Sequence, residues 1–298
     1  MQNKKTMAVV SALVAQVIFG FSFMFTKIAL CYATPMTVIA DRYLVAFIAL
    51  SIVMIFKKLK IKNVKNISKL FVMALFQPVL YFLCESYGIK LTTSGFSSVM
   101  ISLIPVISIF GGMVVLKEFP SPMQYVFTVL SVLGVVVFAY SGKVDGTVTP
   151  LGIVLLLGAV ISSVAYNVLS RKISTEFTPF ERTYAMMVTG LTVFLAISFA
   201  ENINCPVNII INFENPLYTA SILYLGVFSS VIAFLLLNYA NTYLPVSKTT
   251  VFSNITTVVS VLAGIVFLDE KLSVYTVVSS LMIIAGVWGV QLAGQKKP

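Results

Sequence analysis

The chain has 298 residues, of which 59% are hydrophobic and only 10% are charged, and its formal net charge is +10. An ordinary soluble domain is about a quarter charged, so this composition excludes a soluble enzyme. The chain contains no histidine, which excludes imidazole-based zinc and haem sites and Ser-His-Asp triads. The composition therefore predicts an all-α integral membrane protein without a metal or cofactor.

Apolar segments follow one another along almost the whole chain, and each is long enough to cross about 30 Å of hydrocarbon. Ten transmembrane helices are expected, over residues 7–30, 35–56, 67–89, 93–116, 121–141, 151–172, 179–200, 216–242, 246–268 and 272–293. The lysines stand in short segments beside these apolar runs rather than on one amphipathic face. The positive charge therefore indicates membrane orientation and not a nucleic-acid partner.

The distribution of basic residues predicts the orientation of the helices. With the N-terminus inside, fifteen of the 20 Lys and Arg residues fall on the cytoplasmic side, and five fall nearer the outside, among them Lys27 and Arg42. Cytoplasmic loops carry an excess of Lys and Arg. We therefore expect a multi-pass protein of a bacterial inner membrane, with both termini and residues 57–66 cytoplasmic and residues 201–215 external.

An internal repeat divides the chain into two halves, residues 1–145 and 146–298. A shift of 152 residues gives eleven identities, which include Gly112 with Gly264 and Glu118 with Glu270. A shift of 144 pairs Lys27 with Arg171 and Pro35 with Pro179. Five helices per half is an odd number, so the second half must enter the membrane from the opposite face. Such inverted repeats are common in secondary transporters.

Three segments carry a resemblance to a known family: FGFSFMFTKIALCYATPMTVIADRYLVAF, SSVMISLIPVISIFGGMVVLKEFPS and TVFSNITTVVSVLAGIVFLDEKLS. They resemble the EamA-type members of the drug/metabolite transporter superfamily. The resemblance implies ten helices around a central cavity, lined mainly by the third, fourth, eighth and ninth helices, with help from the first and sixth. Relatives move amino acids, amines, nucleotide sugars or other metabolites. Thr257 departs from the family, whose ninth helix often has a proline there.

Glu85 is the first candidate for substrate binding or coupling, because an ionisable group inside a span is costly and needs a reason. Its carboxylate could hold a cationic substrate group or exchange a proton, or it could form a structural ion pair with Lys27 or Arg42. Tyr81 and Gln77 lie four and eight residues before it and extend one polar stripe. Snorkelling to the outer headgroups is a further alternative for Arg42.

Other polar residues within the predicted spans complete the candidate site. Lys27 matches a basic position of the family's first helix, and uncharged side chains supply the rest: Ser102, Tyr166, Asn167, Asn238 and Asn254. Many such residues only bond neighbouring helices. The tyrosines and Phe82 would suit an aromatic substrate portion or a quaternary amine.

The chain has no G-x-x-x-x-G-K-[ST] motif, so a gradient must supply the energy for transport. We expect a secondary transporter that exports a small amphipathic metabolite, an amino acid or a related amine, with protons as a coupling ion. The alternatives are uptake of an organic cation or vitamin-like metabolite and translocation of a lipid-linked substrate. The expected partners are a small-molecule substrate and the lipid bilayer.

Overall fold

The computed structural model describes residues 2–58, 66–101, 103–104, 106–108, 121–127, 129–130, 133–134, 137, 148–203, 211–244, 249, 252–268 and 274–294. The regular secondary structure of these residues is entirely helical. Within the described residues, six segments are long and apolar enough to cross a membrane: Lys4–Ala29, Pro35–Phe56, Ile67–Lys90, Pro150–Thr175, Pro179–Glu201 and Pro216–Tyr243. The predicted all-α membrane fold is confirmed.

The first half of the chain forms α1 (Gln2–Ala29), α2 (Pro35–Phe56), α3 (Ile67–Ala74), η2 (Leu75–Leu80), α4 (Tyr81–Lys90) and α5 (Ser94–Ile101). The π-helical segment η2 joins α3 to α4 within one span. Gln77 breaks the helix there, with φ −143° and ψ 112°. The next residue, Pro78, lacks the N–H that a regular helix would use.

The second half forms α8 (Pro150–Lys172), η3 (Ile173–Thr175), α9 (Pro179–Glu201), η5 (Ile211–Glu214), α10 (Pro216–Leu223), η6 (Tyr224–Ala233), α11 (Phe234–Tyr243), α13 (Ser253–Leu268) and α14 (Val274–Gly294). The π-helical segment η6 joins α10 to α11 as η2 joins α3 to α4. The third span of each half therefore has a π-helical middle.

Four spans begin with the same local signal, a polar cap followed by proline. The cap side chain accepts a hydrogen bond from a backbone N–H of the first turn, and the proline occupies a position whose N–H would be unsatisfied anyway. The four pairs are Thr34-Pro35, Thr149-Pro150, Thr178-Pro179 and Asn215-Pro216. These caps fix where α2, α8, α9 and α10 start.

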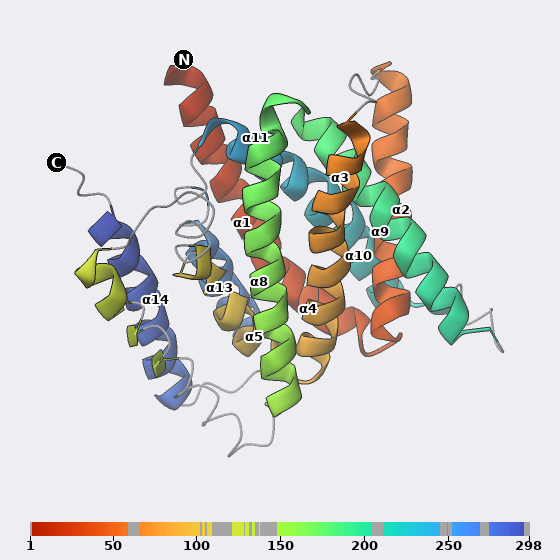
Figure 1. Ribbon diagram of the computed structural model, residues 1–298. Helices are drawn as coiled ribbons and strands as arrows, with labels where there is room; N and C mark the ends of the chain where they lie inside the picture. The colour runs from red at the N-terminus through yellow and green to blue at the C-terminus, as the bar shows by residue number, and fades with distance from the viewer. Residues whose placement is uncertain are drawn as a thin grey trace.

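The two halves run through the bundle in opposite directions. In Figure 1, α1 descends from the N-terminus, whereas α8, the first helix of the second half, ascends. Contacts between the halves follow the same symmetry, because α2 packs against α9, the first span α1 against α10–η6–α11, and the span α3–η2–α4 against α8. The odd number of spans per half thus produces the inverted arrangement that the repeat predicts.

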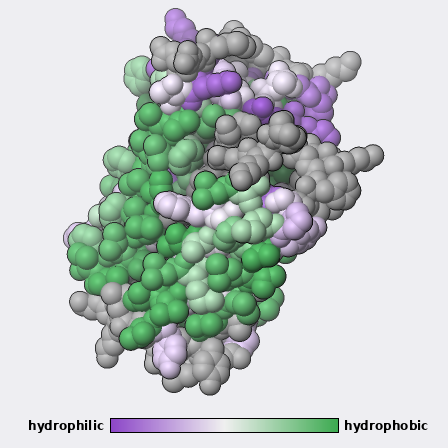
Figure 2. All heavy atoms as spheres, turned by 90° about the vertical axis from the view of Figure 1, so that its left-hand side faces the viewer, coloured by the Kyte–Doolittle hydropathy of each residue, from purple (hydrophilic) through white to green (hydrophobic). Residues whose placement is uncertain are grey.

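The face drawn in Figure 2 is mostly hydrophobic, and its most hydrophilic residues gather at one end. Large apolar side chains such as Phe56, Val154 and Trp288 are exposed, as expected for a surface that faces lipid. The end marked by Lys4, Lys5, Lys57, Lys58 and Lys172 is called the basic end below, and the opposite end, marked by Thr34, Lys90, Thr149, Asn202 and Asn215, is called the Thr34 end.

The helix bounds agree well with the expected spans where the structure describes them. The first helix starts at Gln2 rather than residue 7, because polar residues continue a helix beyond the hydrocarbon where water satisfies them. The predicted spans 93–116, 121–141, 246–268 and 272–293 lie partly outside the described residues, and Glu118 and Glu270 lie outside them.

Candidate functional site

A small cavity of about 60 Å³ lies between the two halves. Its walls come from α1, α2, η2, α4, α5, α8, η6, α11 and α13. All six transmembrane helices that the resemblance implies as cavity walls, the first, third, fourth, sixth, eighth and ninth, are among them. The second helix, α2, also lines the cavity. A water molecule needs about 10–15 Å³ by this measure, so the cavity has room for only a few waters in this conformation.

Arg42 of α2 is the positive group of the cavity. Its side chain is buried; Nε donates to Ser230 Oγ at 2.6 Å and Nη2 donates to Ser229 Oγ at 2.8 Å. The guanidinium carbon lies 4.1 Å from the centroid of the Phe82 ring. Hydroxyls and a ring face offset part of the cost of a cation inside a membrane. Arg42 therefore does not snorkel to the outer lipid headgroups, which was one alternative from the sequence.

Glu85 of α4 is the acidic group of the same cavity. Its carboxylate is buried, and Oε1 accepts a hydrogen bond of 2.7 Å from the Tyr81 hydroxyl one turn earlier. No ion pair with an N···O distance within 4 Å joins Glu85 to Arg42 in the part of the chain that the structure describes. The structural ion pair between Glu85 and Arg42, an alternative from the sequence, is thus not formed. Both side chains line the cavity.

Amide and aromatic side chains complete the walls. Gln77 Oε1 is buried without a hydrogen-bond partner among the described residues, while Gln16 Oε1 accepts from Thr256 Oγ1 at 2.7 Å. Asn167 also lines the cavity, and its Oδ1 accepts from Asn241 at 3.1 Å. Aromatic rings cover the apolar side: Phe19, Phe23, Phe82 and Phe234. The site therefore combines two charges, polar amides and an apolar wall.

Lys27, an expected site residue, does not line this cavity. Its ammonium donates to the backbone oxygens of Ile89 and Thr92, at 3.0 and 2.6 Å. Arg171, its counterpart in the repeat, donates to the backbone oxygens of Asn241 and Thr242 at 2.8 and 2.6 Å. Each basic residue thus binds carbonyls at the end of the third span of its own half, where the helix dipole is negative.

Tyr166 and Asn238, also expected in the site, belong instead to a buried network around Arg182. Asn238 Oδ1 accepts from Tyr166 at 3.0 Å and from Ser170 at 2.8 Å. Arg182 donates to the Ser170 hydroxyl at 2.7 Å and to the Asn238 backbone oxygen at 2.8 Å. These polar groups hold a fully buried guanidinium between α8, α9 and α11, which explains their position away from the cavity.

Two further expected residues are not settled by the structure. Ser102 lies outside the described residues, and the side chain of Asn254 does as well, although its backbone belongs to α13. Of the nine expected residues, the structure brings Glu85, Tyr81, Gln77 and Asn167 together around the cavity.

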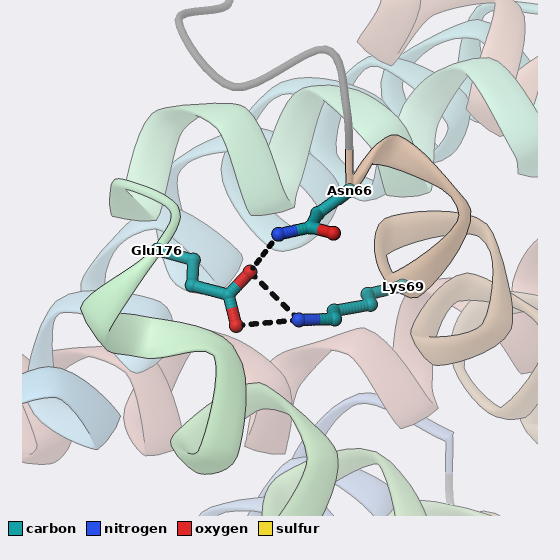
Figure 3. Close-up of polar contacts among 3 residues, drawn as sticks. All are labelled: Asn66, Lys69 and Glu176. Atoms are coloured by element: carbon teal, nitrogen blue, oxygen red, sulfur yellow. Dashed lines mark hydrogen bonds and ion pairs between the residues drawn. The ribbon is translucent and has the colours of Figure 1, made fainter.

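A polar cluster joins the two halves at the basic end (Figure 3). Lys69 of α3 donates to both carboxylate oxygens of Glu176, at 2.6 and 2.8 Å, and Asn66 donates to Glu176 Oε2 at 2.8 Å. The hydrogen bond from Lys69 holds the pKa of Glu176 below its usual value. The three residues are called the basic-end bridge below.

The main residues missed by the sequence reasoning are Arg42, Ser229 and Ser230. Arg42 was visible as a charge inside an apolar span, the same signal that identified Glu85. The two serines gave no signal, because a serine pair in an apolar segment commonly bonds its own helix.

Comparisons with known proteins agree with this architecture. The EamA-like transporter family matches residues 6–140 and again residues 150–292. A Bacillus subtilis protein named "Uncharacterized transporter YcxC" is 32% identical over 300 residues, which cover 99% of this chain and 96% of that protein. An "Uncharacterized transporter" of Archaeoglobus fulgidus is 26% identical over 272 residues, which cover 90% of this chain and 93% of that protein.

A solved structure described as "Crystal structure of protein" has a TM-score of 0.67 at 15% sequence identity and covers 97% of this chain and 99% of that chain. At this identity the likeness supports the fold alone. The family match, by contrast, occurs once in each half of the chain, in agreement with the internal repeat. The protein is a membrane transporter rather than an enzyme, and it belongs to the EamA-like transporter family.

Proposed function

We propose that this protein is a secondary active transporter of a small amphipathic metabolite, an amino acid or a related amine. The observation that carries the proposal is the presence of Arg42 and Glu85 in one cavity without a direct ion pair. Isolated charges are costly inside a membrane protein. A zwitterion would offset both costs, with its carboxylate on Arg42 and its ammonium group on Glu85.

Arg42 has a donor available for such a ligand. Nε and Nη2 bind the two serines, and Nη1 has no hydrogen-bond partner among the described residues. Charge-assisted hydrogen bonds from a guanidinium to a carboxylate are among the strongest in proteins. The aromatic wall formed by Phe19, Phe23 and Phe234 suits the apolar part of the same molecule.

Alternating access fits the size of the cavity. The present volume of about 60 Å³ is well below the several hundred Å³ of typical small-molecule sites, so a metabolite requires the halves to move apart. The π-helical segments η2 and η6 lie in equivalent spans of the inverted halves. Because their backbone hydrogen bonding departs from that of a regular helix, they are suitable places for the third spans to bend. We place the division between the halves near residue 145.

Competition for Glu85 supports export coupled to protons. A protonated Glu85 carries no charge to hold an ammonium group, so a proton and a substrate occupy the site in turn. The transporter therefore exchanges protons for substrate across the membrane. Protons that flow inward then drive the substrate outward. We propose that the basic end faces the cytoplasm of a bacterial cell, in agreement with the excess of Lys and Arg there.

Transport in liposomes tests the proposal. The purified protein is reconstituted and supplied with zwitterionic amino acids, with the matching amines that lack the carboxylate, and with the matching acids that lack the amine. Each compound is tested under an imposed proton gradient and, separately, under a sodium gradient. We expect the zwitterions to move fastest, and only with the proton gradient.

Two variants connect the result to the cavity. Glu85→Gln should abolish transport of zwitterions and amines, whereas Arg42→Gln should remove the preference for zwitterions over amines. The matched control is Glu214→Gln, the same change at an exposed carboxylate of η5, which should transport as the unmodified protein does. A folded Glu85→Gln variant with the native rate and an unchanged pH dependence would exclude both roles of this carboxylate.

The aromatic wall also favours a second candidate, uptake of an organic cation, because quaternary amines bind over ring faces. Faster transport of a quaternary amine than of any zwitterion, with no loss in Arg42→Gln, would favour this alternative over the amino acid.

A further inference from the structure

Asp41 is a second buried carboxylate that the cavity does not use. It precedes Arg42 on α2, and its relative exposure is only 1%. The two neighbouring side chains diverge, because Arg42 enters the cavity while Asp41 faces Tyr218 of α10. The Tyr218 hydroxyl donates to Asp41 Oδ2 at 2.5 Å and is the only hydrogen-bond partner of this carboxyl group among the described residues.

The surroundings of Asp41 favour a neutral carboxylic acid in this conformation. Tyr218 packs in an apolar cluster with Ala29, Val38, Ile222 and Leu225. No ion pair reaches Asp41 among the described residues. An ionised carboxylate has about four acceptor sites, and here one neutral donor serves them. Burying a charge without a partner is expensive, so ionisation requires water or a rearrangement.

Several charged and titratable groups on the neighbouring elements have hydrogen-bond partners other than Asp41. Tyr224 of η6 donates to the Ile18 backbone oxygen, and Lys27 of α1 donates to backbone oxygens at the end of α4. Glu201 of α9 accepts from Thr34 and Tyr87. In the cavity, Arg42 donates to the serines of η6, and Glu85 accepts from Tyr81 on α4. Tyr43 of α2 is buried, and its hydroxyl has no hydrogen-bond partner among the described residues.

A polar pocket comes close to Asp41 from the Thr34 end. It has a volume of about 420 Å³, and Tyr32, Thr37 and Lys90 are among the residues that line it. Thr37 lies one helical turn from Asp41 on the same face of α2, and the Tyr32 ring contacts the Tyr218 ring, with centroids 6.4 Å apart. Asp41 is the sixth residue after Pro35, the first residue of α2, so it lies about 9 Å from the start of the helix along its axis.

We propose that Asp41 is a proton-binding site separate from the substrate cavity, reached through the polar pocket at the Thr34 end. On ionisation the O–H bond breaks, the electron pair stays on the carboxylate oxygen, and the proton passes to water in the pocket. Water can solvate the carboxylate only if α10 moves away from α2.

This movement would reach the cavity through the span that contains α10, η6 and α11. Asp41 and Arg42 are adjacent on α2 and bind different points of this one span, Tyr218 and the pair Ser229 and Ser230. A displacement at Tyr218 therefore also changes the hydrogen bonds of Arg42. Proton release at Asp41 and substrate binding at Arg42 thus act on the same two helices.

Infrared difference spectroscopy tests the site without any substrate. Spectra of the purified protein are compared at acidic and alkaline pH, and the C=O band of a protonated carboxyl group should be missing in Asp41→Asn. Tyr218→Phe should keep this band but move it to higher frequency, because the carbonyl loses its hydrogen-bond donor. Glu85→Gln serves as the control for the cavity carboxylate. Spectra of Asp41→Asn and Tyr218→Phe that match the unmodified protein would overturn the proposal.

The number of protons per substrate gives a second test, which rests on the proposed function. Asn imitates the neutral acid, so Asp41→Asn should still exchange substrate at Glu85 but move one proton fewer per cycle. With a tenfold proton gradient and no voltage, the unmodified protein should balance a zwitterion gradient of about a hundredfold, and the variant one of about tenfold. Equal values in both proteins would contradict the second site. Absence of transport in the unmodified protein would count against the proposed function, and the infrared test would still decide the role of Asp41.

Discussion

Replacement of Gly226 by alanine should disturb the contact that holds Arg42 in the cavity. Gly226 belongs to η6, and the backbone of this segment packs directly on α2. A Cβ atom at this position would lie 2.6 Å from Val45 Cγ1, 2.8 Å from Val45 Cβ and 3.0 Å from the backbone oxygen of Arg42. Real Cβ atoms essentially never come within 3.0 Å of a heavy atom from another part of the structure. Two of the three contacts involve Val45 Cβ and a backbone oxygen, so we expect η6 to move away from α2.

The structure sets the size of this movement. Ordinary van der Waals contact begins at 3.4 Å, so the new methyl group must retreat by about 0.8 Å from Val45. The Nε–Ser230 hydrogen bond of 2.6 Å would then approach the upper limit of about 3.2 Å for N–H···O bonds or exceed it. Overpacking and a weakened charge-assisted bond outweigh the better helix propensity of alanine. The expected loss of unfolding free energy is roughly 2–5 kcal/mol.

Unfolding of the purified protein in detergent measures this loss, and Gly158→Ala is the matched control. A Cβ atom at Gly158 of α8 would meet only Cys84 Sγ at 3.2 Å and Cys84 Cβ at 3.9 Å. The control should therefore be unchanged or up to about 1 kcal/mol more stable, because alanine is the better helix former. The reasoning is refuted if Gly226→Ala unfolds with the free energy of Gly158→Ala or of the unmodified protein.

Three further predictions concern the ends of the bundle. Arg182→Met should lower the unfolding free energy by about 3 kcal/mol or more, measured by denaturant titration, because it leaves several buried acceptors unpaired; a change below about 1 kcal/mol would contradict this role. Lys69 lowers the pKa of Glu176, so the bridge stabilises the protein above the usual Glu pKa, and this stabilisation is lost as pH falls through the lowered value. Glu176→Gln should therefore unfold at a lower temperature than the unmodified protein at neutral pH, with the difference disappearing in acid and shrinking in high salt; a difference that persists in acid would argue against the bridge. In a cysteine-free background, an impermeant maleimide applied to intact cells should label Asn212→Cys but not Lys58→Cys, and the reverse pattern would invert the proposed orientation.

The sequence alone determined the class of protein, the positions of most spans and the inversion of the halves. Hydropathy, cap signals and the parity of the spans are properties of the chain in one dimension, so they can be read without knowing how helices pack. Thr178 and Pro179, for example, start α9 through contacts within a single helical turn. The pairing of Lys27 with Arg171 likewise identified equivalent positions of the two halves.

Only the tertiary structure decided which charges face the cavity. Lys27 and Arg42 both lie in apolar segments near the same end of the chain, but the rotation of each helix and its distant partners set their positions. Lys27 meets backbone oxygens of Ile89 and Thr92, whereas Arg42 meets two serines 187 and 188 residues away.

The positions of the uncharged polar residues also depend on how the helices pack. Tyr166 and Asn238 are residue types that suit a binding site. However, the buried guanidinium of Arg182, on α9, reaches their helices, and their hydrogen bonds belong to its network. Whether a polar side chain binds a neighbouring helix or faces the cavity depends on what the opposite helix presents. This information exists only once the helices are packed together.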